Sequence, residues 1–207
     1  AQKRLHAFDH VLGAVRWLSW AIAGRPFRGS CHNLAYRRGV FFDNKGFSRS
    51  LDLKFGDDDV FVSQVATGAN TAVELSADSM ALCVQTDPSA SHRADRLKYD
   101  FTAPRLRGCA RAVFGSFMLA WWLSIGCTVA VSILGLPSLW PLIAACVVEL
   151  GMWVILSLAW KRTSLALWSR PIFLTFPWYM SLAPLYSLLY TVRGWAKRKS
   201  FYSWGEM

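Results

Sequence analysis

The chain has 207 residues, of which 54% are hydrophobic, and its 23 basic and 13 acidic residues give a formal net charge of +10. Many of the bases stand beside long apolar runs, at residues 105–111, 161–162 and 193–199. Bases in such positions mark the cytoplasmic side of a membrane protein and contact anionic lipids. The charge therefore gives no reason to expect nucleic acid as a partner. The five cysteines form no CxxC pair and show no zinc-site spacing.

The first half of the chain has mixed, globular-looking patterns. Apolar residues at three- and four-residue steps predict an amphipathic helix over residues 5–22, ended by Gly24. A second helix is predicted after the acidic run at 57–59. Residues 71–75 and 80–84 are predicted as two strands, and residues 92–102 as a helical connector. We expect a boundary near Arg111, where the composition becomes mostly apolar.

Two apolar runs in the second half predict membrane helices at about 112–136 and 139–160, each long enough to cross a hydrocarbon core of ~30 Å. The bases flank the pair but not its turn, so both ends are expected in the cytoplasm. Glu149 lies inside the second run and needs a partner, for which a nearby Ser, Thr or Trp is the expected candidate.

A third apolar stretch, 171–192, contains Pro171, Pro177 and Pro184 and has bases on both sides. It predicts a bent, interfacial or re-entrant pair of short helices packed on the hairpin or on the soluble part, because broken backbone at membrane depth must be covered by protein. A third spanning helix is the alternative.

Gly56 is followed by three consecutive aspartates, Asp57, Asp58 and Asp59. Acids at a helix start are favoured by the helix dipole, which is the simplest explanation. Asp57-x-Asp59 is also a D-x-D that suits a hard cation such as Mg²⁺. Crowded carboxylates also raise one another's pKa, which would prepare one of them to act as a general base. The pattern alone leaves all three open.

Four segments in order narrow the choice. They read FRGSCHNLAYRR at 27–38, FFDNKGF at 41–47, GDDDVFVSQVAT at 56–67 and NTAVEL at 70–75. This order and spacing resemble family 2 glycosyltransferases, most of all the membrane-anchored bacterial members related to cellulose, chitin and hyaluronan synthases. The resemblance covers about residues 15–100. It implies a GT-A type fold, so that residues 1–104 form an α+β partial, acceptor-side half, followed by an α-helical transmembrane region over 105–207.

The resemblance also assigns roles. It makes Asp58 the base that takes a proton from the acceptor hydroxyl in an inverting transfer. The residues that it places around the acceptor are Asp57, Asp59, Cys31, His32, Asn33 and Arg37. Asp95, Lys98 and Tyr99 occupy the place of a Q-x-x-R-W element on the nucleotide side. Asp for Gln, Lys for Arg and Tyr for Trp are departures that weaken the expectation of processive polymer synthesis.

The family's nucleotide-binding half, with its own upstream D-x-D, has no counterpart in these 207 residues. The chain is therefore expected to be the C-terminal part of the enzyme and inactive by itself. A divalent cation, Mg²⁺ or Mn²⁺, is expected in the full-length enzyme, with no metal ligands in this part. The expected partners are a nucleotide-sugar donor, a glycan or lipid-linked acceptor and the lipid bilayer. The expected location is the bacterial inner (plasma) membrane, crossed several times, with the catalytic part in the cytoplasm.

Two other functions compete with this interpretation. One is a non-enzymatic small membrane protein, a transporter or channel subunit or a scaffold, with a basic cytoplasmic domain. The other is a metal-dependent phosphotransferase or nuclease that uses the acidic run at 57–59. It would need further donors, for which Asp43, Asp52 and Glu74 are the candidates.

Overall fold

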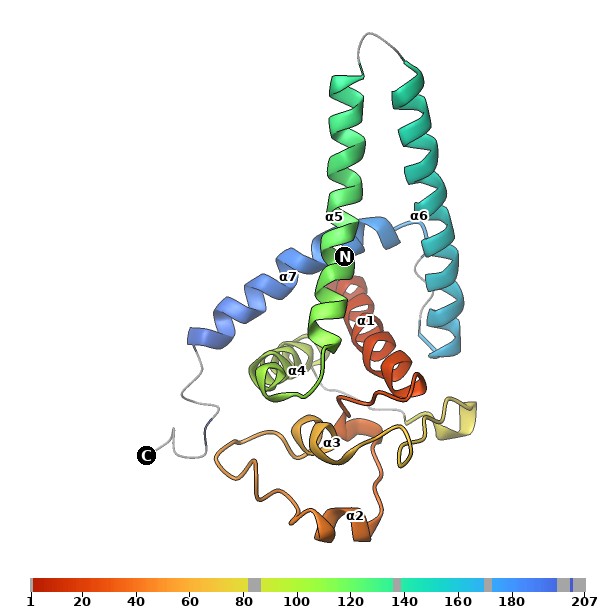
Figure 1. The fold of residues 1–207 in the computed structure, drawn as a ribbon. Coiled ribbons are helices and arrows are strands. Elements are labelled where there is room, and N and C mark those ends of the chain that lie inside the picture. Colours follow the sequence, from red (N-terminus) through yellow and green to blue (C-terminus); the bar gives the residue numbers. More distant parts are fainter. Residues whose placement is uncertain (1, 82–86, 136–138, 170–172, 197–201, 203–207) are drawn as a thin grey trace. The chain divides into compact units, whose positions relative to one another are not determined.

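The computed structural model describes residues 2–81, 87–135, 139–169, 173–196 and Tyr202. The chain forms two compact units. Unit 1 comprises Ala1–Ala110 and Leu185–Met207, and unit 2 comprises Arg111–Pro184. Figure 1 shows the helices of both units in chain order. Because helix α7 (Phe176–Ala196) crosses from one unit into the other, each unit contains part of it.

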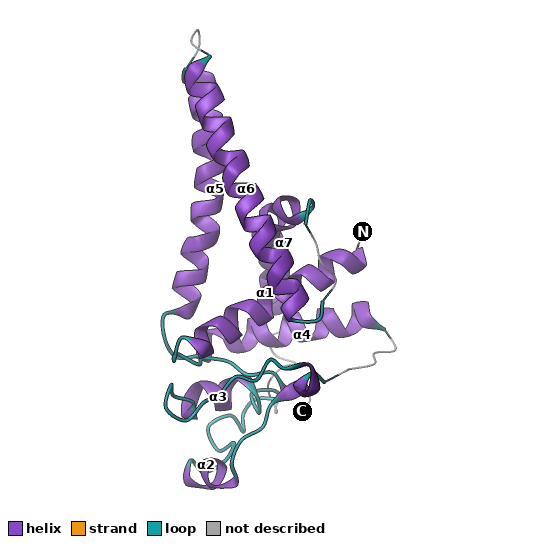
Figure 2. Cartoon of the chain, turned by 90° about the vertical axis from the view of Figure 1, so that its right-hand side faces the viewer, coloured by secondary structure: helices purple, strands orange, loops and turns teal. Residues whose placement is uncertain are grey.

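The α+β prediction for residues 1–104 is wrong. The described residues are 70% helical and contain no strand, only an isolated bridge between Leu53 and Tyr202. Helices and loops account for the described backbone in Figure 2. Residues 71–75 are an irregular segment with half-exposed or exposed side chains, so their alternation does not mark a buried face. Of the second predicted strand, residues 80–81 are irregular and 82–84 lie outside the described residues.

Unit 1 is built on α1 (Gln2–Ile22), α3 (Asp59–Val65) and α4 (Pro88–Thr102), with α4 in contact with both of the others. These three helices confirm the helices predicted at 5–22, after the acidic run, and at 92–102. The core between α3 and α4 contains Leu53, Val60 and Phe101. The apolar face of α3 is thus held against α4, which fixes where the aspartates before it lie.

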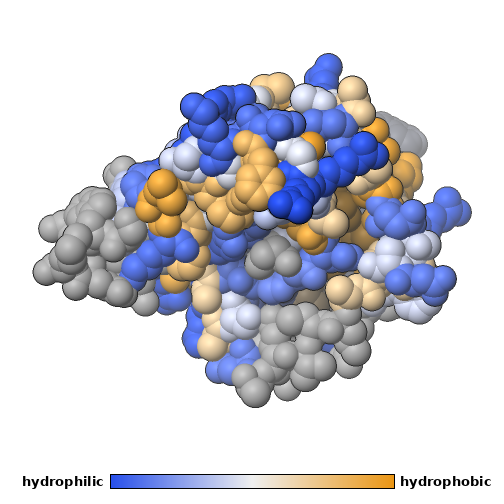
Figure 3. Space-filling model, turned by 90° about the horizontal axis from the view of Figure 1, so that it is seen from below, coloured by the Kyte–Doolittle hydropathy of each residue, from blue (hydrophilic) through white to orange (hydrophobic). Residues whose placement is uncertain are grey.

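The shorter elements of unit 1 are a 3₁₀ turn at Cys31–Asn33, α2 (Arg38–Asp43), and 3₁₀ turns at Ala77–Ser79 and Ala103–Arg105. After α2 the chain turns through Lys45 and Gly46, which both have positive φ. Phe41, Phe47 and Phe61 form an aromatic cluster with ring centroids 5.0–5.7 Å apart. The surface seen in Figure 3 is largely hydrophilic, with hydrophobic areas between the hydrophilic ones.

Unit 2 contains α5 (Ala110–Leu134) from its second residue on, and α6 (Trp140–Ala166). Both are long and apolar enough to cross a membrane. At 1.5 Å per residue, their 25 and 27 residues extend roughly 38 and 40 Å. Their apolar side chains are largely exposed in the chain itself, with only 6% of each apolar window buried. Lipid removes that exposure, and the two helices therefore indicate membrane association.

Helix α6 is longer than predicted. It continues six residues beyond 160, through Lys161 and Arg162, whose long side chains suit a helix that leaves the apolar layer. Trp153 donates from Nε1 to a carboxylate oxygen of Glu149 at 2.7 Å, which confirms the expected kind of partner for this acid. Of the turn predicted between α5 and α6, Gly135 is described, and residues 136–138 lie outside the described residues.

The third apolar stretch is one helix, α7, rather than a pair of short ones. Pro177 is its second residue, where the missing N–H has no partner to lose, and Pro184 is accommodated inside the helix. Among the described helices, the length and hydropathy needed to span a membrane are found in α5 and α6. In unit 2, Phe176 contacts Trp121 of α5 and Trp160 of α6, which confirms packing of this stretch on the hairpin.

Candidate functional site

The three aspartates lie at the N-terminus of α3. Asp58 caps the helix, its carboxylate accepting from the backbone N–H of Asp59 at 2.7 Å. Gly56 precedes them with φ of +122°, a backbone conformation that L side chains rarely adopt. The aspartates differ sharply in exposure: the Asp57 side chain is 60% exposed, whereas Asp58 and Asp59 are 1% and 0% exposed. Only Asp57 therefore faces solvent freely.

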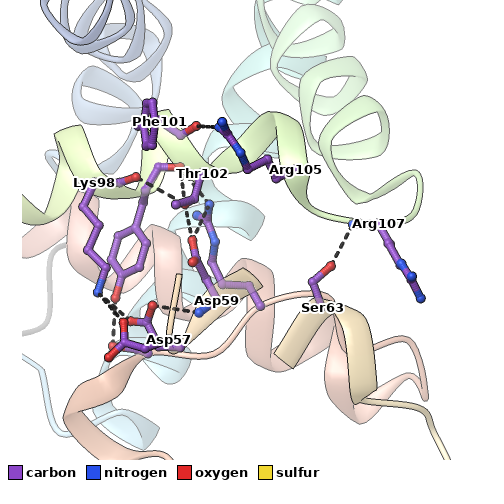
Figure 4. A network of polar contacts seen from close by, with 12 residues as sticks. Asp57, Asp59, Ser63, Lys98, Phe101, Thr102, Arg105 and Arg107 are labelled. Atoms are coloured by element: carbon purple, nitrogen blue, oxygen red, sulfur yellow. Dashed lines mark hydrogen bonds and ion pairs between the residues drawn. The ribbon is translucent and has the colours of Figure 1, made fainter. Parts of the chain in front are cut away.

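Asp58 is paired with Lys98 of α4. The Lys98 ammonium donates to Oδ2 of Asp58 at 2.9 Å and lies 4.0 Å from Oδ1 of Asp57 (Figure 4). A carboxylate removed from water is costly unless a charged partner and hydrogen bonds compensate it, and here Lys98 and the Asp59 N–H do so. The pair joins the start of α3 to α4 across 40 residues of sequence.

Asp59 is held by a different set of groups. Thr102, one turn after Lys98 on the same face of α4, donates its hydroxyl to Oδ2 of Asp59. The Arg28 guanidinium lies 3.7 Å from the same oxygen. Burial raises the pKa of Asp59 to about 6, although Thr102 and Arg28 act in the opposite direction. Asp59 therefore titrates at mildly acidic pH, above the usual range of an aspartate.

Arg28 also connects the loop before the 3₁₀ turn to α4. It donates to the backbone carbonyl of Tyr99 at 2.9 Å and stacks on the Tyr99 ring, with Cζ 4.9 Å from the centroid. The Tyr99 hydroxyl donates to Oγ of Ser30 at 3.1 Å. The segment at 27–38 and the segment at 95–99, which the resemblance assigns to one site, therefore lie in contact.

The remaining predicted site residues are spread around this cluster. His32 lies 3.8 Å from Asp95 through Nε2 and Oδ2, and Asn33 donates to the carbonyl of Ser79 at 2.7 Å. Arg37 is exposed at the start of α2. Cys31 belongs to the 3₁₀ turn, and its side chain lies outside the described residues. His32 and Asp95 thus join the acceptor-side and nucleotide-side segments, whereas Asn33 fastens a loop.

Sequence reasoning missed three members of the cluster: Arg28, Ser30 and Thr102. A signal existed for Thr102, because it stands four residues after Lys98 on a predicted helix and shares its face. Arg28 and Ser30 were quoted within the motif at 27–38 without a role. The structure pairs Lys98 with Asp58, and the assignment of Lys98 to the nucleotide side stays a prediction.

The described residues contain no group of three His, Cys, Asp or Glu side chains placed to hold a metal ion. Asp57 and Asp59, the two acids of the D-x-D, differ in partners and exposure: one is mostly in solvent and the other is buried against Thr102. Asp57 and Asp59 are therefore not arranged to share a cation, and the resemblance places the Mg²⁺ or Mn²⁺ site in the upstream half of the enzyme.

A small cavity lies beside the cluster. It has a volume of about 40 Å³ and shares Arg28 and Tyr99 with the site. The other lining residues are Asp9, His10, Gly13, Trp17, His92, Asp95 and Arg96. Since one ordered water needs on the order of 10–15 Å³ of such space, the cavity fits a few waters and not a sugar ring.

Comparison with protein-family models, with curated proteins and with solved structures finds no match to this chain.

Proposed function

We propose that unit 1 forms the acceptor side of a sugar-transfer site in a membrane-associated, inverting glycosyltransferase of the family 2 kind, with Asp58 as the base. One observation carries the proposal. Asp58, from the G-D-D segment at 56–58, is buried and bonded to Lys98, from the segment at 95–99 that the resemblance assigns to the same site. If the two segments were unrelated, the resemblance would give no reason to expect Asp58 and Lys98 in contact.

The chemistry assigned to this site is one substitution. An acceptor hydroxyl gives its proton to the Asp58 carboxylate, and its oxygen attacks the anomeric carbon of a nucleotide-sugar. The bond to the nucleoside diphosphate breaks, and the diphosphate leaves with the electron pair. Lys98 and the Asp59 N–H fix the position of the Asp58 carboxylate, which accepts the proton in this proposal. In this proposal α5 and α6 anchor the site on the cytoplasmic side of the bacterial inner membrane.

The test is transfer of labelled sugar from nucleotide-sugars in membranes that contain the protein expressed from its complete gene. A positioned base contributes about 10²–10⁴-fold, so Asp58→Asn should reduce transfer by that factor while the protein stays folded. Asp78→Asn is the matched control, because Asp78 is exposed on the turn at Ala77–Ser79. Wild-type transfer by Asp58→Asn would exclude Asp58 as the base.

A second function is favoured by the burial of the aspartate cluster. Asp58 and Asp59 are 1% and 0% exposed, and both are bonded to α4. In a non-enzymatic membrane protein these bonds would fasten α3 to α4 in a basic cytoplasmic domain. That function predicts no transfer by the wild type with any nucleotide-sugar, together with loss of stability on removing Lys98. The transfer assay therefore separates the two.

A further inference from the structure

The part of α7 that belongs to unit 1 has two different faces. One is packed against α1 and α4. Tyr190 is 2% exposed, and its ring lies 6.4 Å from that of His92 and 5.8 Å from the Arg96 guanidinium carbon. Tyr186 lies 6.5 Å from His6 of α1, measured between ring centroids. This inner face fixes the helix on unit 1.

The opposite face is apolar and exposed. It consists of Leu185, Leu188, Leu189, Val192 and Trp195, which are 58%, 61%, 43%, 54% and 74% exposed. Steps of three and four residues place them along one side of the helix, and we call them the α7 stripe. A contiguous apolar surface of this kind on a soluble unit marks an interaction site, because water is an unfavourable neighbour for it.

The charges next to the stripe indicate its partner. Arg193 is exposed in the last turn of α7, and the sequence continues with Lys197, Arg198 and Lys199. Arg105 lines a pocket of about 310 Å³ together with Trp195. Apolar residues with a terminal tryptophan and several bases match an amphipathic helix that binds an anionic membrane surface.

We infer that the α7 stripe docks on the surface of an anionic lipid bilayer, lying in the interface rather than crossing it. The inner face supports an interfacial position, since Tyr190 is buried and Tyr186 is half-buried on this side, and a spanning helix here would bring α1 and α4 into the lipid. Helix α7 begins in unit 2, whose helices α5 and α6 are the candidate membrane spans. If α5 and α6 lie in a bilayer, the same chain brings the α7 stripe to that bilayer.

The experiment uses the full chain in vesicles of phosphatidylcholine with and without phosphatidylglycerol. The five natural cysteines are replaced by alanine, and a nitroxide is attached at Leu188→Cys or Val192→Cys. Leu51→Cys is the matched control, because Leu51 is a leucine of unit 1 that is 72% exposed and lies outside α7 in the sequence. Relaxation by oxygen, which enters lipid, and by a water-soluble nickel chelate gives the depth of each label.

Labels at Leu188 and Val192 should lie about 5–10 Å below the headgroup boundary, and the label at Leu51 should lie in water. Phosphatidylglycerol should increase the depth of the stripe labels, and Arg193→Gln should reduce that increase. Water exposure at Leu188 equal to that at Leu51, or strong spin–spin broadening from a second copy of the chain, would overturn the inference. Because the readout is depth, its failure is distinguishable from failure of the sugar-transfer proposal.

Discussion

Replacing Lys98 by methionine tests the buried pair most directly. Methionine keeps much of the length and apolar volume of the lysine stem and removes the ammonium. Asp58 is 1% exposed, and its Oδ2 then loses the charged partner at 2.9 Å. Breaking a buried ion pair from one side costs roughly 3–5 kcal/mol, because the remaining charge is left without compensation. We expect Lys98→Met to lower the free energy of opening at α3 by that amount.

Asp58→Asn should cost less, about 1.5–3 kcal/mol, the range for losing a hydrogen bond to a charged group. The lysine then still has Asp57 at 4.0 Å, and its side chain is 12% exposed. The asparagine oxygen can keep the bond from the Asp59 N–H. The double variant should cost less than the sum of the single ones, since neither charge is left buried alone.

Hydrogen exchange of peptides that cover residues 56–66 in detergent measures these differences, because α3 opens locally when its start is released. The bond from the Val62 N–H to the Asp58 carbonyl, 3.0 Å in the folded chain, lies inside this window. Protection in Lys98→Met within about 0.5 kcal/mol of wild type, the range of ordinary surface changes, would refute the energetic role of the pair.

Three further predictions concern Asp59, the histidines of α1 and two glycines. The pKa of Asp59 is raised to about 6, so the folded state holds the proton more tightly than the unfolded state does. The stability of the folded state should therefore fall as the pH rises from about 4 to about 6. Hydrogen-exchange protection factors should show this slope in the wild type and not in Asp59→Asn. Burial lowers the pKa of His6 and His10 below 6.5, so the unfolded chain takes up protons at these residues before the folded chain does. Hydrogen-exchange protection of α1 should therefore fall as the pH drops below 6.5. Replacing both histidines by glutamine should remove this fall. Gly56→Ala should lower the free energy of unfolding by about 1–3 kcal/mol, because φ is +122° and the new methyl group would meet neighbours at 3.3 Å. Gly108→Ala should lower it less, because φ is +89° there but nothing lies within 4 Å of the methyl group. Equal losses of stability in the two variants would contradict the role of the contact at Gly56.

Local signals predicted the helices well. The periodicity of residues 5–22, the aspartates before α3 and the uncharged runs of α5 and α6 each specify a helix without reference to the rest of the chain. The strand prediction at 71–75 failed because a strand, unlike a helix, depends on the rest of the chain. Alternating apolar and polar residues indicate that one side of a strand could be buried, but they do not supply the neighbouring strand that it must pair with. Three prolines suggested a broken α7, although only Pro184 lies in its interior.

The candidate site was predictable in part. The resemblance placed Asp58 and the segment at 95–99 in one site, and the structure brings Asp58 and Lys98 into contact. The roles assigned to them stay predictions. The partners of Asp59 were not foreseen, because Thr102 is 43 residues away and Arg28 reaches it from a loop. Such pairings arise only when α3 packs on α4, which no short sequence pattern encodes.

The ends of α1 and α3 meet without any side chain between them. A methyl group at Gly68 would lie 2.6 Å from the carbonyl oxygen of Gly24, so the two backbones touch directly. Residues 25–67, which include Arg28 and the three aspartates, thereby form a closed loop with both ends pinned at one point. Because the backbones touch, any side chain at Gly68 would force Gly24 away, and with it the end of the segment that carries Arg28 to α4.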